Sequence, residues 1–180
     1  MGTGPAKTEH SAADQQKTFK SDEVDLLVKL WALLDKETAF TSTVLEIFSA
    51  NHSIAGYFEL EETDIEDLQY HPRVKGHATI LSNCFDSTIK LLNSGNEAKV
   101  IEMLQKVGRL HFQKRVAFTA VNWLTFKQKL IENLMKSVKL KKKDFEKHQA
   151  IVFKLVTFMI RTIKAGFMSA SLDNGSVKVV

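Results

Sequence analysis

The stretch VKGHATIL, residues 74–81, sets a histidine into an apolar helical face. Val74, His77 and Leu81 follow steps of three and four residues, and the same steps continue to Thr88 and Leu92, which is the spacing of one side of a helix. His77 therefore lies where a core side chain is expected. A core histidine hydrogen-bonded to a backbone carbonyl would explain this position, and so would a ligand.

A second histidine occurs in the same setting. VGRLH, residues 107–111, ends a helical face that also carries Val100 and Leu104. Two neutral imidazoles on different helices each need their own hydrogen-bond partners in a core, because a buried polar group without a partner costs free energy. One metal held between His77 and His111 would satisfy both rings, and imidazole suits iron, copper, nickel and zinc.

The other ligand types indicate which metal centre fits. No Cys–His or carboxylate cluster in the sequence supplies the further ligands of a zinc site. A haem brings four nitrogens of its own and needs only axial ligands and an apolar slot, which the two helical faces offer. Cys84, two turns after His77, is more simply a small core residue than a redox partner.

Composition places the chain among ordinary single-domain globular proteins. It has 180 residues, of which 44% are hydrophobic and 26% charged, and no run approaches the roughly 18 apolar residues of a membrane span. The start, MGTGPAKTEH, lacks the apolar core of a secretory signal, and Ala6 stands where a myristoylation site prefers serine or threonine. The single cysteine fits a reducing compartment. We therefore expect a cytoplasmic protein without membrane attachment.

Periodicity predicts an all-α fold with seven to eight helices. The body contains one proline, Pro72, which suits the first turn of a helix, and the sequence from Ser21 has the hydroxyl and acidic residues of a helix start. One helix is expected to begin at Ser21, and a second to contain Phe40 to Phe48. A third should run from Pro72 to about Asn93, and a fourth should contain Val100 to His111. The last two should span roughly 118–137 and 143–167. Residues 1–20 and 168–180 are predicted to be tails, the first of them disordered.

Lysines crowd into one short segment. Lys136, Lys139, Lys141, Lys142 and Lys143 lie within eight positions. A solvated junction between two helices is the simpler interpretation, and a docking site for an acidic protein or a membrane surface is the alternative. No aromatic residues interleave with these lysines as a nucleic-acid platform requires, so we expect no nucleic-acid partner.

Five features in order resemble the globin family. They are Trp31 in the first helix, TVLEIFSANHSIAGYF at 43–58 with its final phenylalanine, the proline of HPRVKGH at 71–77, the histidine that ends it, and VGRLH at 107–111. Phe58 precedes His77 by 19 residues, and His77 precedes His111 by 34. The resemblance covers most of residues 21–167, which we expect to form the globin domain. In character the chain is most similar to the intracellular neuroglobin-like and nematode globins.

The resemblance implies the globin fold around haem b, iron protoporphyrin IX. It implies that His111 is the proximal iron ligand and His77 the distal residue. The other cofactor-binding residues that it implies are Phe58, Val44, Leu81, Val107 and Arg115. Arg115, with Lys114 beside it, would reach the haem propionates, although plain surface charge also explains both.

The resemblance also implies two roles for His77. It can donate a hydrogen bond to oxygen, or it can bind the iron and give a six-coordinate, bis-histidyl haem. Val44 occupies a position where a tyrosine could have donated a hydrogen bond to bound oxygen. Gly76 either eases a shift of the helix towards the iron or allows close helix packing. We expect the six-coordinate form, acting in oxygen or redox sensing or in electron transfer.

Three alternatives stay open at this stage. The first is a five-coordinate globin for oxygen storage or transport. The second is a haem enzyme, either a nitric oxide dioxygenase or a peroxidase-like catalyst, against which the absence of any acid–base residue beyond His77 argues. The third is a haem-free interaction module. The expected partners are a diatomic gas (oxygen, and also NO or CO) and a redox or signalling protein.

Overall fold

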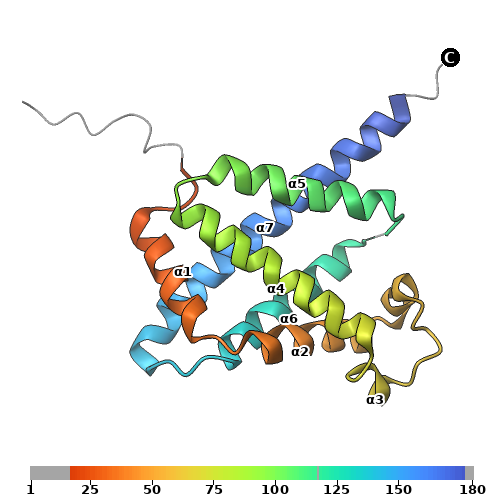
Figure 1. Ribbon diagram of the computed structural model, residues 1–180, viewed down its shortest axis with the longest axis horizontal. Helices are drawn as coiled ribbons and strands as arrows, with labels where there is room; N and C mark the ends of the chain where they lie inside the picture. The colour runs from red at the N-terminus through yellow and green to blue at the C-terminus, as the bar shows by residue number, and fades with distance from the viewer. Residues whose placement is uncertain (1–16, 117, 177–180) are drawn as a thin grey trace, which may run out of the picture.

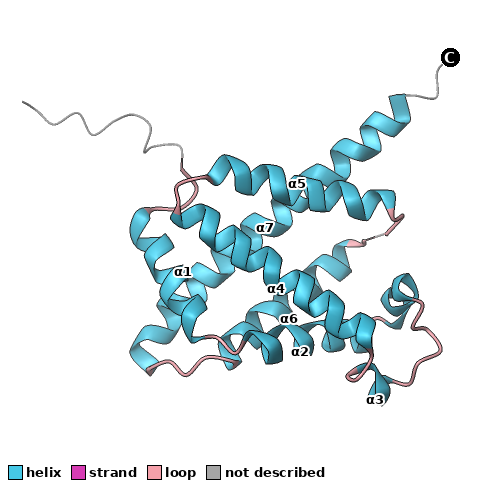
Figure 2. Cartoon of the chain, viewed as in Figure 1, coloured by secondary structure: helices cyan, strands magenta, loops and turns pink. Residues whose placement is uncertain are grey.

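A computed structural model describes residues 17–116 and 118–176, and all regular elements in these ranges are helices (Figure 2). They are α1 (Ser21–Leu33), α2 (Lys36–Ala50), the 3-10 helix η2 (His52–Phe58), α3 (Ile65–Leu68), α4 (Pro72–Asn93), α5 (Glu97–Gln113), α6 (Ala120–Lys136) and α7 (Lys142–Ser176). The predicted all-α fold is confirmed, including the start of α4 at its proline. No helix of the described chain is long and apolar enough to cross a membrane.

The helices cross one another at steep angles around a shared interior (Figure 1). α5 packs on α7, α2 packs on both α4 and α6, and α1 lies against α4 and α7. An aromatic cluster joins the first, second and fourth helices: the Trp31 ring lies 6.0 Å from Phe40 and 6.3 Å from Phe85 between ring centroids. The indole Nε1–H of Trp31 donates a hydrogen bond to Asp86 Oδ1 at 2.9 Å. This cluster fixes α4 against the body of the protein.

Two glycines allow the backbones of α5 and α7 to touch. A Cβ atom at Gly108 would overlap the carbonyl oxygen of Ile163, and one at Gly166 would overlap the carbonyl oxygen of Gln105. Only a residue without a side chain permits such an approach. The glycine that the sequence suggested for close packing, Gly76, is different: a Cβ there would meet nothing within 4 Å. Close packing as an explanation of Gly76 is therefore wrong.

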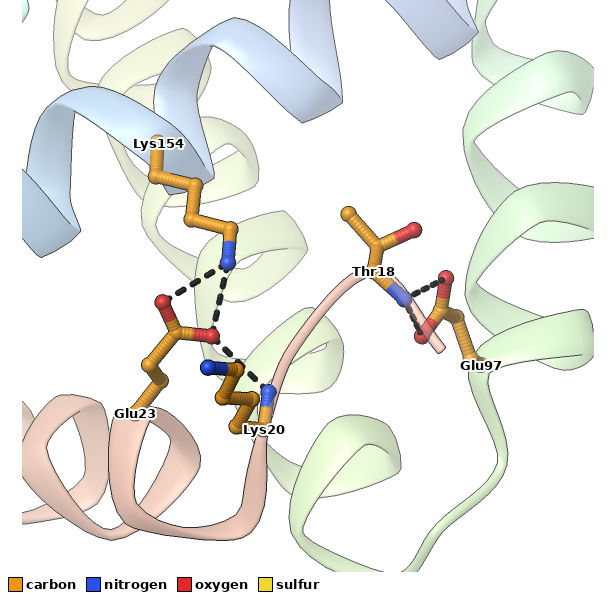
Figure 3. Close-up of polar contacts among 5 residues, drawn as sticks. All are labelled: Thr18, Lys20, Glu23, Glu97 and Lys154. Carbon is orange, nitrogen blue, oxygen red and sulfur yellow. Dashed lines mark hydrogen bonds and ion pairs between the residues drawn. The ribbon is translucent and has the colours of Figure 1, made fainter. Parts of the chain in front are cut away.

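Residues 17–20, which precede α1, are held against the body of the protein. Figure 3 shows the Thr18 backbone N–H donating to both carboxylate oxygens of Glu97, at 3.0 and 3.2 Å. Phe19 is only 4% exposed, and its ring stands edge-on to Phe158 with 5.4 Å between centroids. The prediction of disorder is wrong for residues 17–20, because burial of Phe19 and capture of a backbone N–H hold them in place. Residues 1–16 lie outside the described chain.

The start of α1 is tied to α7 by Glu23. Its carboxylate accepts hydrogen bonds from Lys154 Nζ at 2.6 and 2.7 Å and from the Lys20 backbone N–H at 2.8 Å (Figure 3). The helix begins at Ser21, as expected, but Lys20 rather than Ser21 is its N-cap residue, and the Glu23 carboxylate accepts the hydrogen bond of the Lys20 backbone N–H. These contacts join two segments that lie 131 residues apart.

The last helix is longer than its predicted end at residue 167. α7 continues to Ser176 and projects beyond the helices around it (Figure 1). Phe167 packs edge-on against Phe112 of α5 at 5.3 Å, while Met168 and Leu172 are exposed. The predicted tail is therefore helical over 168–176, because no proline interrupts the helical hydrogen bonds after Phe167. Residues 177–180 lie outside the described chain.

Candidate functional site

A cavity of about 490 Å³ opens between α2, η2, α4, α5, α6 and α7. This volume lies within the range of about 300–1,000 Å³ that is typical of small-molecule sites. Six of the seven predicted cofactor-binding residues line it: Val44, Phe58, His77, Leu81, Val107 and His111. These six residues come from four helical elements, α2, η2, α4 and α5, and meet at one cavity.

The α5 histidine presents a defined ring nitrogen to the cavity. Nδ1 of His111 lies 2.8 Å from the backbone carbonyl oxygen of Val107, one turn earlier in α5. A carbonyl oxygen only accepts hydrogen bonds, so Nδ1 carries a proton, and in the neutral ring Nε2 holds the lone pair. The ring of Phe118 packs at 5.3 Å from the imidazole. Val107 therefore fixes the tautomer of His111 in a form able to bind a metal.

The α4 histidine is neutral and without a hydrogen-bond partner in the described part of the chain. Burial lowers the pKa of His77 to about 4, with a smaller contribution from the nearby ring of His111. Because this pKa lies well below neutrality, the His77 ring carries a free lone pair at neutral pH. The Phe58 ring meets the imidazole edge-on at 4.9 Å.

Arg73 positions the phenylalanine that touches His77. Its Nη1 donates to the backbone carbonyl oxygen of Phe58 at 2.5 Å and pairs with the Glu59 carboxylate. Phe58 also packs against Phe48 of α2 at 5.0 Å. The corner after η2 is thereby attached to α4 one turn before His77. Arg73 was not among the predicted site residues, although its position four residues before His77 on the same helical face was a usable signal.

Of the two residues predicted to contact the haem propionates, Lys114 lies at the cavity and Arg115 lies outside it. Lys114 lines the cavity. Arg115 does not: it is exposed and adopts a left-handed backbone conformation with φ of 57°. The turn after α5 thus leaves Arg115 outside the cavity, although Val116 lines it again. Contact of Arg115 with a cofactor stays a prediction.

Cys84 and Asn122 are among the other polar residues that line the cavity. Burial raises the pKa of the Cys84 thiol to about 11, so the thiol stays protonated, in agreement with its expected role as a small core residue. Asn122, which the sequence analysis missed, is buried at the start of α6. Its Oδ1 accepts hydrogen bonds from the Thr119 backbone N–H and hydroxyl, at 2.8 and 2.7 Å. This pair closes the first turn of α6.

The residues present fit a haem better than a metal ion alone. Two imidazoles, those of His77 and His111, line a cavity whose other walls are mainly aliphatic and aromatic. The described residues contain no group of three or more histidine, cysteine or carboxylate side chains that could hold a metal ion. A planar cofactor that supplies its own equatorial nitrogens would complete the coordination of a metal here.

Comparison with known proteins identifies the family. The family model described as globin matches residues 41–159. Similar folds occur in a globin of Drosophila melanogaster (TM-score 0.69, 23% identity, covering 81% of this chain and 93% of that one). The globin-like protein Glb-12 of C. elegans is also similar (TM-score 0.72, 14% identity, covering 87% of this chain and 93% of that one). So is a hexacoordinated haem protein of an anhydrobiotic tardigrade (TM-score 0.70, 17% identity, covering 83% of this chain and 96% of that one). The chain belongs to the globin family and is a haem-binding globin.

Proposed function

We propose that this globin holds haem b between His111 as proximal ligand and His77 as distal ligand, in a six-coordinate state that serves oxygen or redox sensing or electron transfer. The observation that carries the proposal is the state of His77. Its imidazole is neutral, lacks a hydrogen-bond partner in the described chain, and shares the cavity with His111. Coordination would satisfy the lone pair that the protein leaves free.

Different residues of the chain would contact the iron, the haem plane and the propionates. The Val107 carbonyl oxygen orients His111 and makes Nε2 a better donor to a metal. Phe58 would lie against the haem plane, with Val44 and Leu81 lining the distal side. Lys114 at the cavity would neutralise a propionate, a role also predicted for Arg115.

Coordination by both imidazoles would suit sensing and electron transfer. The haem, when bound, supplies an iron that exchanges one electron and binds diatomic gases. Two neutral imidazoles can stay in place in either oxidation state, so electron transfer requires no exchange of ligands. A gas such as oxygen, NO or CO must compete with His77, and its apparent affinity falls with the fraction of open sites.

The cavity leaves His77 as the main acid–base candidate for the enzyme alternative. Among its described lining residues none is Asp, Glu or Arg, so His77, or Tyr57 and Lys114 near it in the lining, would have to supply the acid–base group that a peroxidase-like catalyst needs beside the reacting oxygen atoms. The tardigrade neighbour, itself a hexacoordinated haem protein, supports the six-coordinate alternative over a five-coordinate storage globin. A cytoplasmic location stays a prediction from the single cysteine.

Carbon monoxide binding kinetics test this proposal. In the ferrous protein, the association rate should level off at high CO concentration, because His77 must first leave the iron. His77→Ala should remove the plateau and give a rate proportional to CO concentration. His148→Ala is the matched control, since His148 bonds to Asp144 of its own helix and does not line the cavity. A wild-type rate that rises linearly, like that of His77→Ala, would exclude coordination by His77.

A further inference from the structure

The net charge of the chain is concentrated in one short segment. The chain has 25 basic and 21 acidic residues, a net charge of +4. Residues 136–147 contain six lysines and two acidic residues, which is also a net charge of +4 and leaves 19 basic and 19 acidic residues elsewhere. We call these lysines the basic junction: Lys136, Lys139, Lys141, Lys142, Lys143 and Lys147. The remainder of the chain is electrically balanced.

The basic junction is accessible and its charges are not neutralised by ion pairs. It lies where α6 ends and α7 begins, and all six lysines are exposed. None of the six forms an ion pair with a carboxylate in the described chain. Their positive potential is therefore directed into solvent, where it attracts an anionic partner.

Exposed apolar side chains accompany the lysines. Phe145 lies within the segment and is 38% exposed, and Leu33 at the end of α1 is 62% exposed. The Asp35 backbone N–H donates to the Ser137 carbonyl oxygen at 3.3 Å, which holds the α1–α2 turn against the basic junction. Figure 1 shows this turn beside the connection from α6 to α7. Basic and apolar groups thus share one end of the molecule.

An acidic segment lies at the other end of the molecule. Residues 59–67 contain six acidic residues and no basic ones, and they surround α3, which lies at the opposite end of the long axis from the α6–α7 connection (Figure 1). An anionic surface would attract one end of the protein and repel the other. The charge distribution therefore favours a single orientation on such a surface.

We propose that the basic junction docks this globin on an anionic lipid bilayer. Clusters of four to eight lysines or arginines are typical of segments that bind anionic headgroups, and exposed apolar side chains beside them enter the interface. A protein partner is a poorer fit, because interfaces between proteins are depleted in lysine and enriched in arginine and aromatic residues. The cluster contains six lysines and no arginine. Such docking would be peripheral and reversible by salt.

Vesicle binding by the haem-loaded full-length protein tests the proposal. The probes are vesicles of phosphatidylcholine with 30% phosphatidylserine and vesicles of phosphatidylcholine alone, in 100 mM salt. The junction variant is Lys139→Gln/Lys141→Gln/Lys143→Gln. The matched control is Lys99→Gln/Lys106→Gln/Lys164→Gln, which removes three exposed lysines from α5 and the far part of α7. Both variants change the net charge equally and touch only exposed side chains.

The wild type should bind the anionic vesicles and not the neutral ones. The junction variant should bind about a hundredfold more weakly, at roughly fivefold for each lysine near the surface, and the control should bind like the wild type. Absence of wild-type binding, or equal losses in both variants, would overturn the proposal. Binding to soluble poly-L-glutamate as tight as binding to the vesicles would overturn it in favour of an acidic protein partner.

Discussion

Substituting alanine for Gly108 should open the contact between α5 and α7. An added Cβ would overlap the Ile163 carbonyl oxygen and would lie 2.7 Å from the Phe167 backbone nitrogen. That nitrogen must move by at least about 0.7 Å to reach the 3.4 Å of an ordinary contact. Because backbone atoms cannot rotate away as a side chain can, we expect a loss of about 3 kcal/mol in the free energy of unfolding. His111, three residues further along α5, would move with the helix.

Gly76→Ala is the matched control for this prediction. Its Cβ meets nothing within 4 Å and the position is exposed, so alanine should stabilise α4 by about 0.5–1 kcal/mol. Urea unfolding of both variants and the wild type measures the two effects, and haem transfer to an apoprotein acceptor measures retention of the cofactor. Gly108→Ala should unfold at lower urea and lose haem faster. Wild-type stability for Gly108→Ala would refute the argument that the two backbones touch there.

Three further substitutions test other parts of the structure. Phe19→Ala should lower the free energy of unfolding by about 3 kcal/mol, because the buried ring packs on Phe158, and a change below 0.5 kcal/mol in urea titration would show that the segment is not docked. Partial burial raises the pKa of Glu23, but hydrogen bonds from Lys154 and a backbone N–H together bring it below its usual value. Glu23 therefore stabilises the fold fully above pH 4.5 and loses this effect as pH falls through its folded-state pKa, which lies below 4.5. The stability difference between wild type and Glu23→Gln should therefore shrink as pH falls below 4.5, and a difference that stays constant down to about pH 3 would contradict this. His111→Ala should release haem much faster to an acceptor, and unchanged release would contradict the proximal assignment.

Periodicity was sufficient to predict the helices that carry the site. The apolar steps through VKGHATIL and the proline before it predicted α4 from Pro72 to about Asn93, and the structure has these bounds. The same steps placed His77 and His111 on inward faces of different helices, and both line one cavity. Local spacing predicts such features because a helix sets the direction of each side chain from its own sequence.

Contacts between distant segments could not be predicted in this way. Phe19 reads as an isolated apolar residue in a polar segment, and its partner Phe158 lies in the last helix. Glycine in a helix indicates either looseness or close approach, and only the packing of α5 on α7 distinguishes Gly108 from Gly76. The predicted end of α7 at residue 167 is too early, because a mostly polar sequence without proline, such as residues 168–176, can either fray or continue as helix.

The absorption spectrum of the ferrous protein without added ligand distinguishes directly between a six-coordinate and a five-coordinate haem. Coordination by both His77 and His111 predicts the two resolved visible bands of a low-spin, six-coordinate haem. His77→Ala should convert them to one broad band, while His148→Ala should leave them unchanged. A single broad visible band in the wild type, or a His77→Ala spectrum identical to that of the wild type, would contradict the claim that His77 binds the iron.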